Sequence, residues 1–144
     1  MTDARFAGLE IKKLEILLSR YAISYLKKYD ADLCPLQTEA LVVIHDNGGS
    51  MVQKHLESIL GIRKSTLSGM LNTMIKNGFI EKRDSETDQR SKVVCLTRKG
   101  EEFYDTALRD LVLLDNTITA GIPPEDLETM MRVIDRMRSN VEDD

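Results

Sequence analysis

Small polar and basic residues recur along one predicted helix, residues 63–77, at positions that place them on a single outer face. They are Lys64, Ser65, Thr66, Ser68, Gly69, Asn72 and Thr73. Ser and Thr hydroxyls mostly bind phosphate oxygens, whereas Lys and Asn can also read the edges of bases. This chemistry suits close approach to duplex DNA. Gly69 is explained equally well by approach to a groove and by relief of crowding within the helix.

The opposite face of this helix is apolar, so the helix must pack on a core. Its apolar residues recur at three- and four-residue spacing: Leu67, Met70, Leu71, Met74 and Ile75. Upstream, residues 52–60 carry a second helical stripe at Val52, Leu56, Ile59 and Leu60, and Gly61 supplies a turn. The pattern predicts two helices joined by a tight turn.

A polar hairpin follows the second helix. Gly78 ends the helix, and residues 79–83 and 92–96 read as short strands on either side of a polar loop, residues 84–91. Lys82, Arg83 and Lys92 are candidate phosphate contacts, or equally well solvated charges on the strands. Helix, turn, helix, strand, basic hairpin and strand are the layout of a winged helix-turn-helix, and we assign it to residues 33–100, called the winged lobe below.

Charge is distributed unevenly along the chain, whose formal net charge is -4. Residues 1–49 carry net -1, residues 50–100 carry ten basic and five acidic side chains, net +5, and residues 101–144 carry net -8. Positive charge therefore gathers in the segment that the pattern assigns to DNA, while an acidic tail should point away from phosphates.

Helices are predicted on both sides of the winged lobe. Residues 6–26 form one long amphipathic stripe, Pro35 starts a further helix, Thr97 is a plausible cap for the next, and Pro124 opens the last. A terminal helix cannot bury its whole apolar face against so small a lobe, so residues 1–32 and 101–144 are predicted to join two copies. The alternative is a monomer in which these helices pack on the lobe.

Composition suits one compact domain, residues 1–144, of a protein in the cytoplasm. No signal peptide or long apolar run is seen, and Cys34 and Cys95 do not form a disulfide framework. His45 and His55 are the only histidines, ten residues apart, so we expect no metal site. No Gly-rich phosphate loop or nucleophile motif points to an enzyme or to a cofactor.

Five short motifs in the winged lobe resemble the MarR family of transcriptional regulators. They are Leu60-Gly61-Ile62, Ser65-Thr66-Leu67-Ser68, Gly78-Phe79-Ile80-Glu81-Lys82-Arg83, Asp88-Gln89-Arg90 and Leu96-Thr97-Arg98-Lys99-Gly100. The resemblance implies a mainly α fold with a small β-wing and a homodimer joined through its N- and C-terminal helices. It implies a repressor that binds a pseudo-palindromic operator and is released by a small aromatic or phenolic effector.

The same resemblance gives Arg90 a role in the minor groove, with Asp88 orienting it. A guanidinium suits a narrow groove, which concentrates negative potential. The alternative is a hairpin stabilised by an Asp88–Arg90 pair without DNA contact, although an exposed pair contributes only about 0–1 kcal/mol.

Effector and redox chemistry are less defined by the residues. The resemblance implies an effector site between the dimer helices and the winged lobe, for which Tyr21, Tyr25, His45 and Met51 are candidates, although the tyrosines also fit a core or an interface. Cys34 is either a reactive thiol near a helix N-terminus or a passive small residue. The competing function is a winged-helix protein-interaction module without DNA binding.

Overall fold

The computed structural model describes residues 5–28, 33–88 and 90–142. In chain order its elements are α1 (Ala7–Lys28), α2 (Pro35–Asp46), β1 (Ser50–Val52), α3 (Gln53–Leu60), α4 (Lys64–Lys76), β2 (Ile80–Asp84), β3 (Lys92–Leu96), α5 (Arg98–Ile118) and α6 (Pro124–Glu142). The predicted mainly α fold with a small β-wing is confirmed. The chain separates into two compact units, residues 1–114 and residues 115–144, so the boundary falls within α5.

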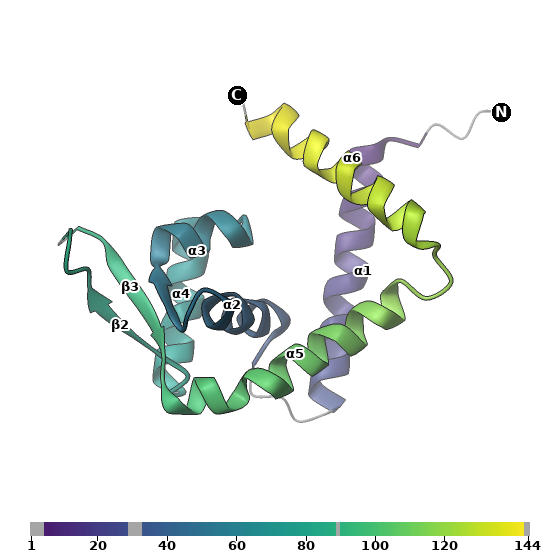
Figure 1. The fold of residues 1–144 in the computed structure, drawn as a ribbon. Helices are drawn as coiled ribbons and strands as arrows, with labels where there is room; N and C mark the ends of the chain where they lie inside the picture. Colours follow the sequence, from purple (N-terminus) through teal and green to yellow (C-terminus); the bar gives the residue numbers. More distant parts are fainter. Residues whose placement is uncertain (1–4, 29–32, 89, 143–144) are drawn as a thin grey trace. The chain divides into compact units, whose positions relative to one another are not determined.

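The β-sheet of the first unit has three antiparallel strands in the order β1-β3-β2. β2 and β3 form the predicted hairpin, which projects beside α3 and α4 in Figure 1. The prediction that Val52 begins a helix is wrong, because Val52 lies in β1 and pairs with Val93. Gly48 and Gly49 both have φ of 89°, which turns the chain out of α2 and into this short strand. A strand of three residues is too short to show an alternating pattern.

The core of the winged lobe is formed by α2, α3, α4 and the sheet. Leu67, Leu71 and Met74 on the inner face of α4 are fully buried, as are Leu56 of α3 and Phe79 before β2. The predicted inner face of α4 is therefore confirmed, with Met70 and Ile75 packed at its margin. The turn before α4 uses Gly61 at φ 65°, whose N–H donates to the Glu57 carbonyl at 3.0 Å. This αL glycine ends α3 without steric cost.

α5 is fixed to the end of α4 through the Leu-Thr-x-x-Gly motif. The Thr97 hydroxyl donates to the Gly78 carbonyl at 2.5 Å and accepts the Gly100 N–H at 3.2 Å, so Thr97 caps α5 as predicted. Lys99 Nζ donates to the Asn77 carbonyl at 2.7 Å and lies 4.4 Å from the centre of the Phe79 ring. A Cβ at Gly100 would clash with the Phe79 carbonyl oxygen. The motif glycine is therefore required by close packing.

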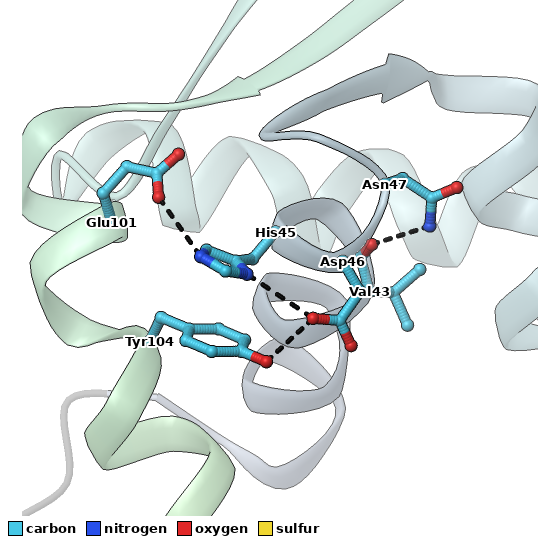
Figure 2. A network of polar contacts seen from close by, with 6 residues as sticks. All are labelled: Val43, His45, Asp46, Asn47, Glu101 and Tyr104. Carbon is cyan, nitrogen blue, oxygen red and sulfur yellow. Dashed lines mark hydrogen bonds and ion pairs between the residues drawn. The ribbon is translucent and has the colours of Figure 1, made fainter.

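A second joint connects α5 to the end of α2, and Figure 2 shows its polar contacts. The His45 ring stacks on Tyr104 with 3.5 Å between ring centres, and its Nε2 lies 3.6 Å from a carboxylate oxygen of Glu101. Tyr104 donates its hydroxyl proton to Asp46 at 2.8 Å, and this hydrogen bond raises the pKa of Tyr104. Two separate joints therefore hold the first turns of α5 against the winged lobe.

In the second unit, Gly121 adopts φ 78° after α5 and Pro124 begins α6, as the sequence predicts. None of the α6 residues is buried. Met131 and Val141 are 56% and 72% exposed, so the apolar seam of this helix has no cover within its own unit.

Candidate nucleic-acid interface

The outer face of α4 is open to solvent over its whole length. The exposed residues there are Lys64, Ser65, Thr66, Gly69, Asn72 and Thr73. A Cβ at Gly69 would meet no atom within 4 Å, so crowding within the chain does not explain this glycine. Ser68 is half-buried instead, because its hydroxyl accepts a hydrogen bond from Gln53 Nε2 at 3.2 Å. Ser68 therefore ties α3 to α4 at the edge of this face.

The first turn of α4 presents free backbone N–H groups. Arg63 is the residue before the helix, and its side chain makes no capping hydrogen bond. The backbone N–H groups of a helix's first turn have no partner within the helix and carry partial positive charge. This end of α4 can therefore receive an anion.

At the tip of the wing, Asp88 shapes the turn that carries Arg90. One oxygen of the Asp88 carboxylate accepts the backbone N–H of Arg90 at 2.9 Å, and the other accepts the Ser91 hydroxyl at 3.3 Å. The Asp88 carboxylate thus contacts the backbone of Arg90, and the ion pairs of the described residues do not join it to the guanidinium. Arg90 is exposed and its charge is available to an external partner. Among the described residues, no ion pair between Asp88 and Arg90 stabilises the hairpin.

The three other basic residues predicted to contact DNA from the wing, on β2 and β3, differ in exposure and in ion pairing. Arg83 is exposed and Lys82 is half-buried on β2. Lys92 forms an ion pair with Asp84, its direct cross-strand neighbour, so its charge is partly neutralised. Lys92 is consequently a weaker phosphate ligand than Arg90 in the free protein.

Gln53, Lys54 and Glu57 of α3 also belong to this surface, although no sequence pattern predicts them there. Together with Lys64, Arg90, Ser91 and Lys92, they line a surface hollow of about 310 Å³. Their polarity at the start of a helix was visible, but the proximity of α3 to the wing follows from β1, which sequence patterns do not reveal. The candidate interface thus has three parts: the α4 face, the wing tip and the hollow between them.

The four effector candidates do not form one contact cluster in the structure. Tyr21 and Tyr25 lie side by side on α1 with 6.4 Å between ring centres, while His45 stacks on Tyr104. Met51 is 7% exposed and belongs to the hydrophobic core, so a ligand would have to displace it. An effector site at these residues stays a prediction.

Metal-binding groups, cysteines and membrane-spanning helices can also be checked in the described residues. They contain no group of three or more His, Cys, Asp or Glu side chains placed to hold a metal ion. Cys34 is exposed at the start of α2, where its backbone N–H donates to Gln37, and Cys95 is buried in β3. Within residues 5–28, 33–88 and 90–142, no helix is long and apolar enough to span a membrane.

Known proteins share both sequence and fold with this chain. Residues 31–91 match the MarR family. An uncharacterized HTH-type transcriptional regulator of Bacillus subtilis, YybA, is 28% identical over 85% of this chain and 81% of its own length.

Two solved structures extend the likeness to nearly the whole chain. A putative MarR family transcriptional regulator from Listeria monocytogenes, complexed with 26mer DNA, superposes with a TM-score of 0.80 at 22% identity, covering 97% of this chain and 91% of its own. AbsC, a MarR family regulator from Streptomyces coelicolor, gives a TM-score of 0.83 at 19% identity, covering 98% and 100%.

The order of the elements, the position of the five motifs within them and the match over residues 31–91 agree with one another. Over residues 31–91 the chain is therefore similar to the MarR family of transcriptional regulators, and its fold is that of the two solved MarR family regulators.

Proposed function

We propose that this protein binds duplex DNA in a sequence-specific manner as a homodimer and represses transcription from a pseudo-palindromic operator. The observation that carries the proposal is the exposed polar face of α4 beside a wing whose Arg90 is held out to solvent by Asp88. An effector-controlled release, action in the cytoplasm, and a division into a DNA-binding lobe, residues 33–100, and dimer helices, residues 1–32 and 101–144, belong to the same proposal.

α4 has the dimensions and chemistry of a recognition helix. It is 13 residues long, its inner face is anchored in the core, and its outer face carries hydroxyl, amide and ammonium groups. B-DNA admits one α-helix in its major groove, where Asn72 can reach base edges, Lys64 can reach a base edge or a phosphate, and Ser65 and Thr66 can bind phosphates. The free N–H groups at its start add an anion-binding end.

The wing complements α4 from the side. With α4 in the major groove, Arg90 at the wing tip reaches the adjacent minor groove, where a guanidinium is favoured by the concentrated negative potential. Lys82 and Arg83 supply further contacts to the backbone. The net charge of +5 over residues 50–100, against -8 over residues 101–144, directs the winged lobe toward DNA and the C-terminal segment away from it.

The terminal helices support a dimer. Leu9, Leu14 and Leu17 on α1 are each at least half exposed, at 55%, 50% and 62%. On α5, Leu108 and Val112 are exposed, and α6 buries none of its residues. A surface with this much exposed apolar area marks an interface. A second copy, related by two-fold symmetry, would cover these faces and set two recognition helices one helical turn of DNA apart.

The function is tested by fluorescence anisotropy of the purified full chain on duplexes from the region upstream of its own gene. The reference is a scrambled duplex of the same length, and both are measured at two salt concentrations. The proposal predicts tight binding that falls with salt and favours the upstream duplex. Binding to neither duplex, nor to any operator sought elsewhere in the genome, would favour a winged-helix protein-interaction module instead.

A further inference from the structure

The hollow between α3, α4 and the wing is built by strand pairing. β1 pairs with β3 so that Val52 lies opposite Val93. The start of α3, which follows Val52, therefore lies close to Lys92, which precedes Val93. As a result Lys54 and Glu57 of α3 line the same hollow as Arg90 and Lys92 of the wing, and Lys64 at the start of α4 completes the lining. Residues up to 40 positions apart in the sequence, from Val52 to Lys92, share one concave surface of about 310 Å³.

Charge in the hollow is largely uncompensated. Lys92 is paired with Asp84, but the ion pairs of the described residues engage neither Lys54, Lys64 nor Arg90. They leave the half-buried Glu57 carboxylate unpaired as well. Three available cations therefore share the hollow with one carboxylate, which leaves a concave site that is positive overall and suited to an anion.

The geometry of duplex DNA identifies the anion. The major and minor grooves are separated by a sugar-phosphate backbone. If α4 occupies the major groove and Arg90 the neighbouring minor groove, one strand of that backbone must pass between the start of α4 and Arg90. The hollow lies at this place, because both Lys64 and Arg90 line it.

We propose that the hollow seats a phosphodiester group of this backbone, held by Lys54 and Lys64, and that Glu57 opposes the binding electrostatically. The inference rests on the proposed DNA binding and adds two residues of α3 to the interface. Glu57 lowers the affinity for every duplex alike, because a phosphate carries no sequence information. A regulator with this carboxylate depends more on base contacts by α4 to remain bound.

Lys54 is tested by Lys54→Gln in the full chain, with Lys12→Gln on the exposed surface of α1 as the matched control. We measure duplex affinity against salt concentration by anisotropy. Loss of a charged contact to phosphate should weaken binding about tenfold and lower the slope of log K against log salt by about one per subunit. Lys12→Gln should change neither. Equal behaviour of the two variants, while Arg90→Ala still weakens binding, would overturn the proposal and leave the proposed function standing.

Glu57 gives a test of opposite sign. Glu57→Gln keeps the shape of the side chain and removes its charge, so affinity should rise severalfold for both the upstream and the scrambled duplex. The control is Glu128→Gln on α6, which should leave affinity unchanged. An unchanged or lower affinity for Glu57→Gln would contradict the electrostatic role, since no lost contact would offset the removed charge.

The source of the phosphate is distinguished by titrating inorganic phosphate into the free wild-type protein and Lys54→Gln, followed by amide NMR. Shifts confined to the hollow that vanish in Lys54→Gln, combined with unchanged duplex affinity for that variant, would assign the site to a free phosphate-bearing molecule and overturn the proposal. Reduced duplex affinity without such shifts is the result we expect. If the wild-type protein binds no duplex, the proposed function itself fails.

Discussion

The helices of the winged lobe and the terminal helices are both amphipathic, but they differ in how far their apolar residues are buried. On α4 the inward residues Leu67, Leu71 and Met74 are all fully buried. On α1 and α6 the apolar residues at the same helical spacing stay exposed, with Leu17 at 62% and Met131 at 56%. The winged lobe therefore closes its own core within one chain. The terminal helices leave their apolar residues exposed, as the proposed dimer requires.

The largest expected effect is a loss of stability in the winged lobe, whose core is closed within one chain. Phe79 is fully buried and meets Phe103 edge-on with 5.4 Å between ring centres, at the point where α4, β2 and α5 join. Phe79→Ala should lower the free energy of unfolding by about 3–5 kcal/mol. Urea denaturation monitored by circular dichroism checks this, with Phe6→Ala, at an exposed position, as the control that should change it little.

The next effect concerns the terminal helices, whose apolar faces are exposed. Leu17→Lys on α1 places a charge on the exposed apolar face, and it should leave the fold of the winged lobe unchanged while dissociating the dimer. Burying a leucine stabilises an interface by about 1.5–3 kcal/mol, so the dissociation constant should rise at least tenfold. Sedimentation equilibrium measures it. A wild-type protein that is monomeric at micromolar concentration would contradict the comparison.

Gly100→Ala tests the close packing where α5 leaves the winged lobe. The added methyl group would meet the Phe79 carbonyl oxygen at the first joint of α5, and the backbone there would have to shift. Overpacking of this kind destabilises a fold by about 1–3 kcal/mol. Thermal denaturation of this variant should show a clear loss, whereas Gly69→Ala, where a Cβ meets open space, should stabilise α4 slightly or leave it unchanged.

The smallest effect tests the second joint of α5 through its pH dependence. The hydrogen bond to Asp46 raises the pKa of Tyr104 above its ordinary value of 10.0. A raised pKa means that this bond stabilises the fold at pH values below about 10 and ceases to do so as pH rises through the folded-state pKa. Tyr104→Phe should therefore be slightly less stable than wild type at pH 8, and the difference should shrink as the pH rises above 10. A difference that persisted at high pH would assign the effect to packing.

Much of this architecture was predictable because the winged lobe obeys local rules. The inner face of α4, Pro35 at the start of α2, Thr97 as a cap and Pro124 at the start of α6 all follow from spacing and capping chemistry. The turn at Gly61 is similarly local. These features depend on neighbours within four residues, which a sequence displays directly.

Features that depend on distant residues were missed or misread. β1 is only three residues long and is stabilised by pairing with β3, about 40 residues later, so the sequence pattern alone predicts a helix at Val52. The hollow that Lys54 and Glu57 line follows from the same pairing and was equally hidden. Asp88 was expected to orient Arg90, but its contact with the Arg90 backbone required the geometry of the turn.

The most direct test of Arg90 at the wing tip as a DNA contact compares Arg90→Ala with Arg136→Ala, a change of the same kind on the exposed surface of α6. Anisotropy on the upstream duplex over a range of salt concentrations gives both affinity and salt dependence. Arg90→Ala should weaken binding about tenfold and flatten its salt dependence, while Arg136→Ala should match the wild-type protein. Equal affinities and equal salt slopes for the two variants would contradict the placement of the wing on DNA.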